Sequence, residues 1–199
     1  MPQKHLLLAS SSPYRRELLA RLRLPFTCAS PNINESPAPG EDPAALARRL
    51  AESKSRALAP IYPSHWIIGS DQVAALPSGA LLSKPGNYST AFRQLEQCSN
   101  KSVNFHTGLA LLDSDSGNLQ IACEQFTVHF RELSAKEIDA YLRKEEPYDC
   151  AGSFKMEGMG ITLFRELQGR DPNSLVGLPL IALNEMLIAW GRNPLLESR

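Results

Sequence analysis

The sequence places two arginines where a buried strand gives way to a helix. The apolar run "LLLAS" is followed by "SSPYRRELL", in which Ser12 is an expected N-cap and Arg15 and Arg16 fall in the first helical turn. The helix dipole disfavours cations at this end by roughly a few tenths of a kcal/mol. Free backbone N–H groups and neighbouring arginines there favour an anion such as phosphate. An ordinary exposed first turn is the alternative interpretation.

A carboxylate interrupts the most hydrophobic strand pattern in the middle of the chain. Asp71 lies in "WIIGSDQV", beside the small residues Gly69 and Ser70. A buried charge costs several kcal/mol unless it is paired or binds a metal ion. Asp71 is therefore either a functional carboxylate at a strand end that opens on a cleft or a salt-bridged structural residue.

Three further charged residues complete a set that could bind a metal-complexed phosphate. Glu35 lies in the Pro- and Asn-rich loop "SPNINESPAPGEDP", Lys54 in the helical pattern "LAESKSRAL", and Lys84 in "LLSKPG". Taken singly, each is most simply a surface charge. Together with the arginine pair and Asp71 they supply cations for a polyphosphate and two carboxylates for a divalent ion.

The elements that must position these side chains alternate between strands and helices in the first half of the chain. Hydrophobic periodicity and capping signals predict elements in the following segments: strands at 5–10, 26–29 and 65–76; helices from Ser12, from Pro43, over 88–98, from the capping box of Ser134 and Glu137 to Lys144, and over 178–191; and a long hairpin over 101–130. This order predicts an α/β protein with a mixed sheet, folded as two lobes around a cleft. The segment "YDCAGSFKMEGMGITLF" is expected to lie against a ligand or another backbone because of its glycines.

The bulk composition excludes several classes of function. The chain has 199 residues, with 21 Lys and Arg against 21 Asp and Glu, so no overall field would draw it to nucleic acid or to a membrane. Its 4 cysteines form no CxxC pair and are expected to be free thiols in a reducing compartment. There is no signal-peptide or membrane-span pattern, and no P-loop, GxGxxG, HExxH or GxSxG motif. A cytoplasmic protein is the expectation.

The motifs taken together resemble the Maf nucleotide pyrophosphatases. The resemblance rests on "ASSSPYRRELL", the "NES" around Glu35, "LAESKSRAL", "IIGSDQV", "LLSKP" and "YDCAGSFKMEG", and it runs from about Leu6 to Leu187. It implies a single Maf-like domain over residues 1–199, with a Maf/ITPase-like mixed twisted sheet in two lobes that flank a central nucleotide-binding cleft. It also implies hydrolysis of a nucleoside triphosphate to a monophosphate and pyrophosphate with a divalent cation such as Mg, Mn or Co.

The resemblance carries roles over to individual residues. Asp71 matches the catalytic aspartate that accepts a proton from the attacking water, and with Glu35 it is expected to hold the metal ion. The expected phosphate-binding residues are Ser10, Arg15, Arg16, Lys54 and Lys84. A small-molecule nucleotide is the expected partner, and a homodimer is left open as the assembly.

Four positions depart from the commonest pattern of the family. Tyr14 replaces an arginine, Gln72 a threonine, Glu157 a glutamine and Cys150 a lysine. The first three are expected to determine substrate specificity. They look like the subgroup that acts on 7-methyl-GTP.

This subgroup assignment has a physical basis. Methylation at N7 makes the guanine ring cationic, and a cationic ring prefers the face of Tyr14 to an arginine. The Glu157 carboxylate can accept from both N1–H and the 2-amino group, whereas a glutamine offers one acceptor. Two alternatives stay open: a pyrophosphatase with another base preference, such as dTTP, UTP or a broad set, and a nucleotide-sensing regulator of septum formation with little turnover.

Overall fold

A computed structural model of the protein describes residues 4–197 and confirms the expected α/β class. A seven-stranded sheet has the order β2-β1-β3-β5-β6-β7, and β4 pairs with β3. The sheet is mixed, because β1 is parallel to β2 and β3 while β4 and β7 are antiparallel to their partners. The elements in chain order are β1 (His5–Ala9), α1 (Pro13–Ala20), β2 (Phe26–Ala29), α2 (Pro43–Leu58), β3 (His65–Ala75), β4 (Leu81–Leu82), α3 (Tyr88–Cys98), β5 (Ser102–Asp113), β6 (Leu119–Phe130), α4 (Ala135–Glu145), the 3-10 turns η1 (Ala151–Ser153) and η2 (Met159–Leu163), β7 (Phe164–Gly169), α5 (Pro172–Val176) and α6 (Leu180–Ala189).

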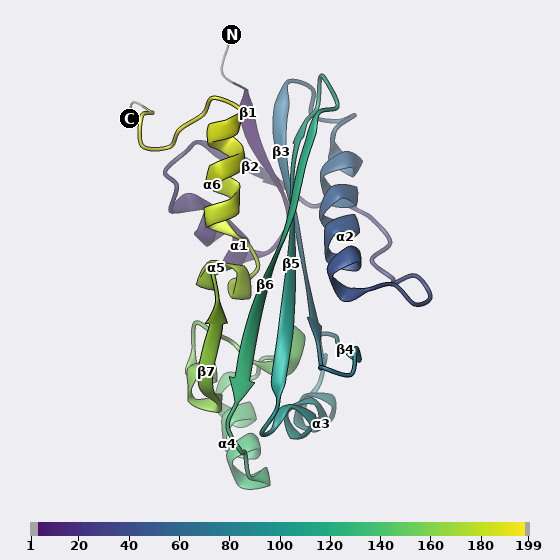
Figure 1. Ribbon diagram of the computed structural model, residues 1–199, viewed down its shortest axis with the longest axis vertical. Coiled ribbons are helices and arrows are strands. Elements are labelled where there is room, and N and C mark those ends of the chain that lie inside the picture. Colours follow the sequence, from purple (N-terminus) through teal and green to yellow (C-terminus); the bar gives the residue numbers. More distant parts are fainter. Residues whose placement is uncertain (1–3, 198–199) are drawn as a thin grey trace. The chain divides into compact units, whose positions relative to one another are not determined.

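The chain divides into two compact units. Unit 1 comprises residues 1–71, 107–124 and 171–199, and unit 2 comprises residues 72–106 and 125–170. In unit 1, α2 covers one face of the sheet and α6 the other (Figure 1). Because side chains alternate along a strand, β1 contributes buried side chains to both faces of the sheet. Leu6 and Leu8 pack in a cluster with Leu183 of α6, while Leu7 packs with Leu58 of α2.

Two glycines let α2 lie unusually close to the sheet of unit 1. A Cβ atom on Gly69 of β3 would come within 2.0 Å of the Ala51 carbonyl oxygen. A Cβ atom on Gly108 of β5 would come within 2.1 Å of the Ala47 carbonyl oxygen. Since any side chain at either position would collide with the helix backbone, the helix–sheet spacing here depends on glycine.

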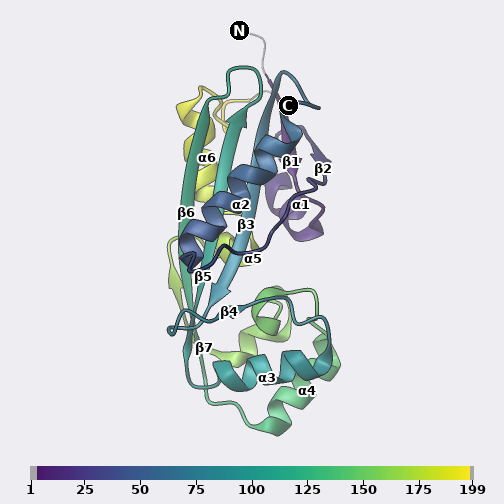
Figure 2. The same ribbon diagram turned by 90° about the vertical axis from the view of Figure 1, so that its right-hand side faces the viewer.

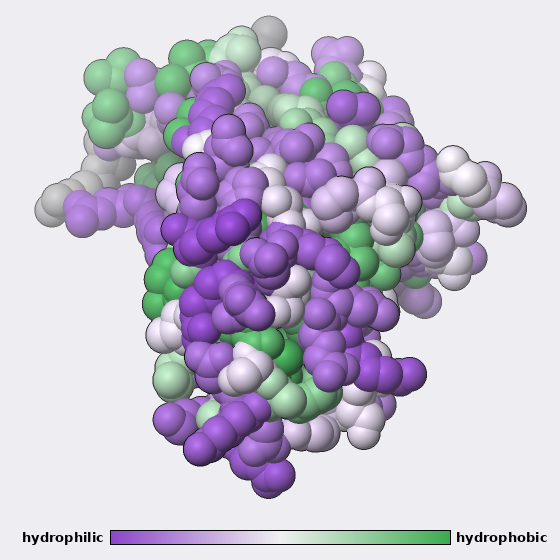
Figure 3. Space-filling view, turned by 60° about the horizontal axis from the view of Figure 1, so that its bottom comes forward, coloured by the Kyte–Doolittle hydropathy of each residue, from purple (hydrophilic) through white to green (hydrophobic). Residues whose placement is uncertain are grey.

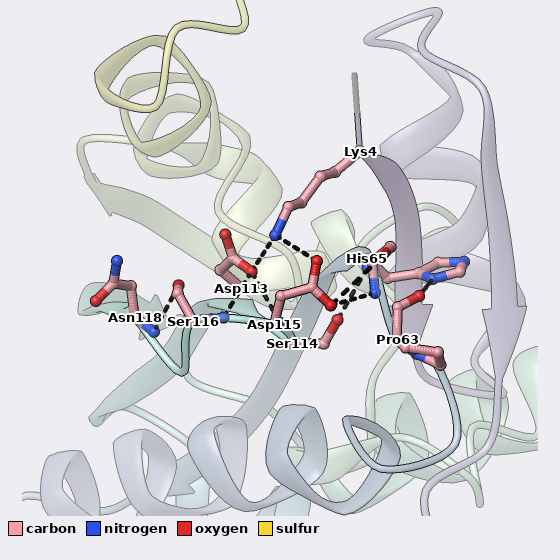
Figure 4. A network of polar contacts seen from close by, with 9 residues as sticks. Lys4, Pro63, His65, Asp113, Ser114, Asp115, Ser116 and Asn118 are labelled. Atoms are coloured by element: carbon pink, nitrogen blue, oxygen red, sulfur yellow. Dashed lines mark hydrogen bonds and ion pairs between the residues drawn. The ribbon is translucent and has the colours of Figure 1, made fainter. Parts of the chain in front are cut away.

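The start of β1 is tied to the β5–β6 turn by a polar network (Figure 4). Lys4 donates to Asp113 and lies 3.0 Å from Asp115, and the Ser64 amide donates to Asp115 at 2.8 Å. Burial acts to lower the pKa of Lys4, but the hydrogen bonds to the two carboxylates outweigh it and raise that pKa. These carboxylates therefore have a structural role in unit 1, holding one end of the sheet.

Unit 2 is built on two helices and an aromatic cluster. Helices α3 and α4 lie side by side (Figure 2). Phe154 makes edge-on contacts with Phe105, Phe130 and Phe164, at ring-centroid distances of 5.3, 5.9 and 4.8 Å. Such edge-to-face pairs bury much apolar area per residue. They fix the glycine-containing segment that follows α4 onto β5 and β6.

Most of the expected elements are confirmed, and the differences are instructive. The strand expected over 65–76 is present as β3, which runs from His65 to Ala75 without a break at Gly69–Gln72. Ser10 lies just after β1, and the closing helix is limited to Leu180–Ala189, with Gly191 at a φ of 83° beyond it. The sequence did not predict β4, β7 or α5. The predicted capping box of Ser134 and Glu137 is present, and all four cysteines are free thiols.

One face of the surface can be followed in Figure 3. Hydrophilic residues predominate on the face drawn in Figure 3, with smaller hydrophobic areas among them. The most exposed large apolar residues are Ile61, Leu195 and Leu196. None of the described helices has the length and apolar composition needed to cross a membrane.

Candidate active site

Lys54 joins two carboxylates in unit 1. Its ammonium nitrogen lies 2.8 Å from Oε1 of Glu35 and 2.5 Å from Oδ1 of Asp71. The Lys54 side chain is 8% exposed and that of Asp71 13%, whereas that of Glu35 is 58% exposed. The structure therefore brings together three of the predicted site residues. It also supplies the counter-charge that a carboxylate within a strand requires.

The close approach of α2 to the sheet explains this meeting. Lys54 lies one helical turn beyond Ala51, whose carbonyl rests on Gly69, and Asp71 lies two residues beyond Gly69 on the same strand face. Lys54 and Asp71 therefore lie at the same end of the contact between Ala51 and Gly69, where their side chains meet. Asp71 lies inside β3, not at a strand end.

Arg15 is held by a main-chain carbonyl in unit 1. Its Nε donates to Gly177 O at 2.8 Å, and its Nη1 makes a longer contact of 3.5 Å to Ser10 Oγ. Ser10 Oγ also accepts from the Ser12 amide at 3.1 Å. Burial lowers the pKa of Arg15, while Asp71 and Glu35 act to raise it. The guanidinium stays charged because its ordinary pKa is so high.

The start of α1 has the local features expected of an anion-binding turn. Ser12 is the N-cap, Pro13 opens the helix, and the first turn has no acidic residue. Arg15 is partly buried, whereas Arg16 is exposed and its charge acts to lower the pKa of Cys28 against the effect of burial. Tyr14 is partly buried. The two arginines thus lie in different environments although they are adjacent in sequence.

The donor set around Lys54 fits a hard divalent cation. Glu35 and Asp71 offer only carboxylate oxygens, and both reach one cationic nitrogen. Within residues 4–197 there is no group of three or more His, Cys, Asp and Glu side chains arranged to hold a metal ion. Mg²⁺ is commonly held by one or two carboxylates, with substrate phosphates and water completing the coordination. Glu35 and Asp71 are sufficient for that kind of site, but not for a cage made of protein ligands alone.

Unit 2 contains Lys84, Gln72 and Glu157. Gln72 follows Asp71 in β3 and is partly buried. Lys84 is exposed on the segment between β4 and α3, which is held on either side: the Gln94 side chain donates to Ser83 O at 3.0 Å, and the Gly86 amide donates to Tyr148 O at 3.0 Å. The backbone around Lys84 is thus fixed, while its side chain extends into solvent.

The Glu157 segment is pinned to α4 at both ends. The Lys155 amide donates to the Tyr141 hydroxyl at 3.0 Å, and the Met159 amide donates to Glu145 Oε1 at 3.1 Å. A Cβ atom on Gly160 would come within 2.2 Å of the Lys155 carbonyl oxygen. Gly160 therefore makes the expected close contact with another backbone segment, whereas a Cβ atom on Gly158 would meet the side chain of Glu145. Glu157 itself is exposed between the two anchors.

Cys150, which replaces a lysine of the commonest family pattern, is not activated. Burial, followed by the charge of Asp149 and a hydrogen bond to it at 3.4 Å, raises the pKa of the Cys150 thiol to about 12. A thiol with such a pKa stays protonated near neutral pH, so it is neither a nucleophile nor a substitute for the lysine charge.

Sequence reasoning missed the partners that orient these residues. Gly177, with a φ of 115°, ends α5 and supplies the carbonyl that binds Arg15. Asp171 caps α5 and Pro172 opens it. The pattern "DPNSLVGLP" has the Asp–Pro start and glycine end of a short helix, which was the available signal. Its length of 5 residues is too short for hydrophobic periodicity to reveal.

Comparison with known proteins defines the class of the chain. A family model described as Maf-like protein matches residues 5–190. The chain therefore belongs to the Maf family.

Curated relatives give a more particular similarity. The chain is 61% identical over 186 residues to the 7-methyl-GTP pyrophosphatase of Pseudomonas syringae pv. tomato, in an alignment that covers 94% of this chain and 96% of the relative. Two proteins with the same name are also similar, with the same coverage: the one from Pseudomonas fluorescens strain Pf-5 is 58% identical, and the one from Pseudomonas savastanoi pv. phaseolicola is 59% identical. All three relatives are named as pyrophosphatases.

Proposed function

We propose that this protein is a nucleoside triphosphate pyrophosphatase that hydrolyses 7-methyl-GTP to 7-methyl-GMP and pyrophosphate, a house-cleaning activity on a modified nucleotide. The structural observation that carries the proposal is the buried Lys54 ammonium between Asp71 and Glu35. A buried carboxylate beside cations is suited to activating water next to a phosphate. The names of relatives up to 61% identical support the choice of substrate.

In the proposed reaction, Asp71 accepts a proton from the attacking water. The water oxygen forms a bond to the α-phosphorus, the α–β phosphoanhydride bond breaks, and pyrophosphate leaves with the bonding electrons. Lys54 holds Asp71 in place by the 2.5 Å contact and contributes positive charge. Ser10, Arg15, Arg16, Lys54 and Lys84 are proposed to bind phosphate oxygens, for which guanidinium and ammonium donors are well suited.

A divalent cation held by Glu35 and Asp71 would neutralise charge on the phosphates as pyrophosphate leaves. Mg, Mn and Co are the proposed ions, because the two ligands offer only oxygen. Exhaustive chelation should abolish activity, and adding back Mg, Mn or Co should restore it. Full activity after chelation would exclude the metal requirement.

Base selectivity is assigned to Tyr14, Gln72 and Glu157. A tyrosine face attracts the cationic methylguanine ring, and the Glu157 carboxylate accepts from its N1–H and 2-amino groups. Tyr14 is partly buried and Glu157 is exposed, so neither is locked inside a core. The convergence of these three side chains on one base stays a prediction.

A single cytoplasmic Maf-like domain over residues 1–199, acting as a homodimer, completes the proposal. Size-exclusion chromatography with light scattering tests the assembly.

A panel of nucleotides tests the function as a whole. Pyrophosphate release should be fastest with 7-methyl-GTP and slower with GTP, dTTP and UTP. A preference for dTTP or UTP would favour the alternative base specificity. Tight binding of nucleotides with no pyrophosphate release from any of them would favour the nucleotide-sensing regulator.

A further inference from the structure

One main-chain carbonyl of unit 1, that of Gly177, receives two side-chain donors. Arg15 Nε lies 2.8 Å from this oxygen, and Ser70 Oγ lies 2.9 Å from it. The Ser70 hydroxyl has a single proton, which is shared between Gly177 O and Gly108 O, the latter also at 2.8 Å, and Ser70 is 0% exposed. A carbonyl oxygen has lone pairs for both donors. Ser70 and Arg15 are therefore linked through a shared acceptor although their side chains arise from β3 and α1.

The Gly177 carbonyl, which Ser70 and Arg15 share, lies at the end of α5, and other hydrogen bonds also hold this helix in place. Asp171, which is 1% exposed, accepts from the Asn173 amide at 2.9 Å and from the Ile181 amide at 2.8 Å, so one carboxylate caps both α5 and α6. Thr107 of β5 donates to Ser174 O at 2.8 Å and is 0% exposed. The segment from Asp171 to Gly177 is therefore hydrogen-bonded to two strands: Thr107 of β5 binds Ser174 O within α5, and Ser70 of β3 binds Gly177 O at the end of α5.

The conformation of Gly177 allows the arginine to approach. Its φ of 115° suits glycine, and a Cβ atom there would lie 3.2 Å from Arg15 Nε. The bonds to Gly177 and Ser10 use only part of the donor set of the guanidinium. The remaining N–H groups form the planar fork that binds phosphate oxygens. The direction of that fork depends on where the Gly177 carbonyl lies.

We propose that Ser70 is a positioning residue for phosphate binding: it fixes the Gly177 carbonyl, which in turn orients the guanidinium of Arg15. The inference rests on the proposed function, in which Arg15 binds phosphate. A merely structural Ser70 would stabilise the fold without affecting how tightly phosphate binds. The two roles differ in whether the effect of Ser70 depends on Arg15.

Calorimetric titration with inorganic tripolyphosphate provides the test, because it needs no turnover. Ser70→Ala should weaken binding about tenfold, the scale of one charged hydrogen bond. In an Arg15→Ala background the same change should have no further effect, since the group through which Ser70 acts is gone. Thr107→Val is the matched control. It removes a buried hydroxyl bond to the same short helix, so it should lower the unfolding midpoint but leave tripolyphosphate affinity unchanged.

Each outcome decides the question. The inference would be overturned if Ser70→Ala bound tripolyphosphate as tightly as the unmodified protein, or if Ser70→Ala weakened binding by the same factor in the Arg15→Ala background. It would also be overturned if the unmodified protein did not bind tripolyphosphate. If Ser70→Ala does not fold, Ser70→Cys, which keeps the size and has a weaker donor, is judged by the same criteria. If the coupling is found but no nucleotide is hydrolysed, the positioning role stands and the proposed function fails.

Discussion

Two candidate residues of unit 1 lie in regular secondary structure, whereas two candidate residues of unit 2 lie in loops. Lys54 and Asp71 lie in a helix and a strand, are largely buried, and contact one another directly. Lys84 and Glu157 are exposed, and only the backbone on either side of them is held. Groups that must be placed accurately for proton transfer benefit from rigid elements, while loops suit recognition. The residues proposed for chemistry, Asp71 and Lys54, thus lie in unit 1, and two of the three residues proposed for selectivity, Gln72 and Glu157, lie in unit 2.

Removing the carboxylate from β3 should have the largest effect. Asp71→Asn keeps the shape of the side chain but removes the proposed general base, which typically costs roughly 10²–10⁴ in rate. Tripolyphosphate binding should stay within about tenfold, because the phosphate cations remain. Glu52→Gln is the control, since it removes a half-exposed carboxylate that pairs with Arg56 on α2. An active Asp71→Asn enzyme would contradict the assignment of chemistry to unit 1.

Removing the buried cation should affect both stability and activity. Lys54→Gln leaves Asp71 partly buried without its 2.5 Å partner, which should lower the free energy of unfolding by about 3 kcal/mol and reduce kcat/KM. Arg56→Gln, on the same helix but exposed, should change the free energy of unfolding by less than about 1 kcal/mol. Urea unfolding and steady-state kinetics measure both. Equal effects of the two substitutions would show that burial gives Lys54 no special role.

Changing the loop carboxylate of unit 2 should alter selectivity while leaving general turnover nearly intact. Glu157→Gln should weaken kcat/KM for 7-methyl-GTP by roughly 10- to 100-fold, the scale of a charged hydrogen bond. Activity on uncharged bases should fall much less. Glu166→Gln, another exposed acid of the same unit, is the control. If Glu157→Gln keeps the same preference for 7-methyl-GTP, then Glu157 does not determine base selectivity.

The smallest expected effect concerns one carboxylate with a lowered pKa in each unit. Arg49 lowers the pKa of Glu41 from 4.5 to about 2, and backbone and side-chain bonds from Ser134 lower that of Glu137 from 4.5 to about 2. A lowered folded-state pKa means that the stabilisation is present above 4.5 and is lost as pH falls toward 2. The stability differences between the protein and Glu41→Gln or Glu137→Gln should therefore shrink over this range. A pH-independent difference for either variant would show that its carboxylate charge does not contribute.

Local signals allowed much of the fold to be predicted from sequence. The strand at Phe26–Ala29 and the helix at Tyr88–Cys98 have the predicted bounds, and the Ser12 cap and the Ser134–Glu137 capping box are present as expected. Caps and periodicity depend on residues a few positions apart, which a single sequence contains. The short helix α5 was missed because it is held by bonds from Ser70 and Thr107, which are distant in sequence.

The candidate site was predictable as a set of residues, but its geometry was not. Glu35, Lys54 and Asp71 could be selected as unusual charges and by family resemblance. Their meeting at one ammonium depends on the contact of α2 with Gly69 and Gly108, which is a tertiary effect. The roles of the individual site residues stay predictions.

The Gly177 carbonyl has a consequence for how this protein would respond to mutational scanning. Side-chain replacement leaves a backbone oxygen in place, so an alanine scan can remove Arg15 or Ser70 but never the atom that joins them. The link would appear only as epistasis between two positions whose side chains come from different elements. Replacing the amide that follows Gly177 with an ester would weaken the carbonyl as an acceptor and probe the link with every side chain intact.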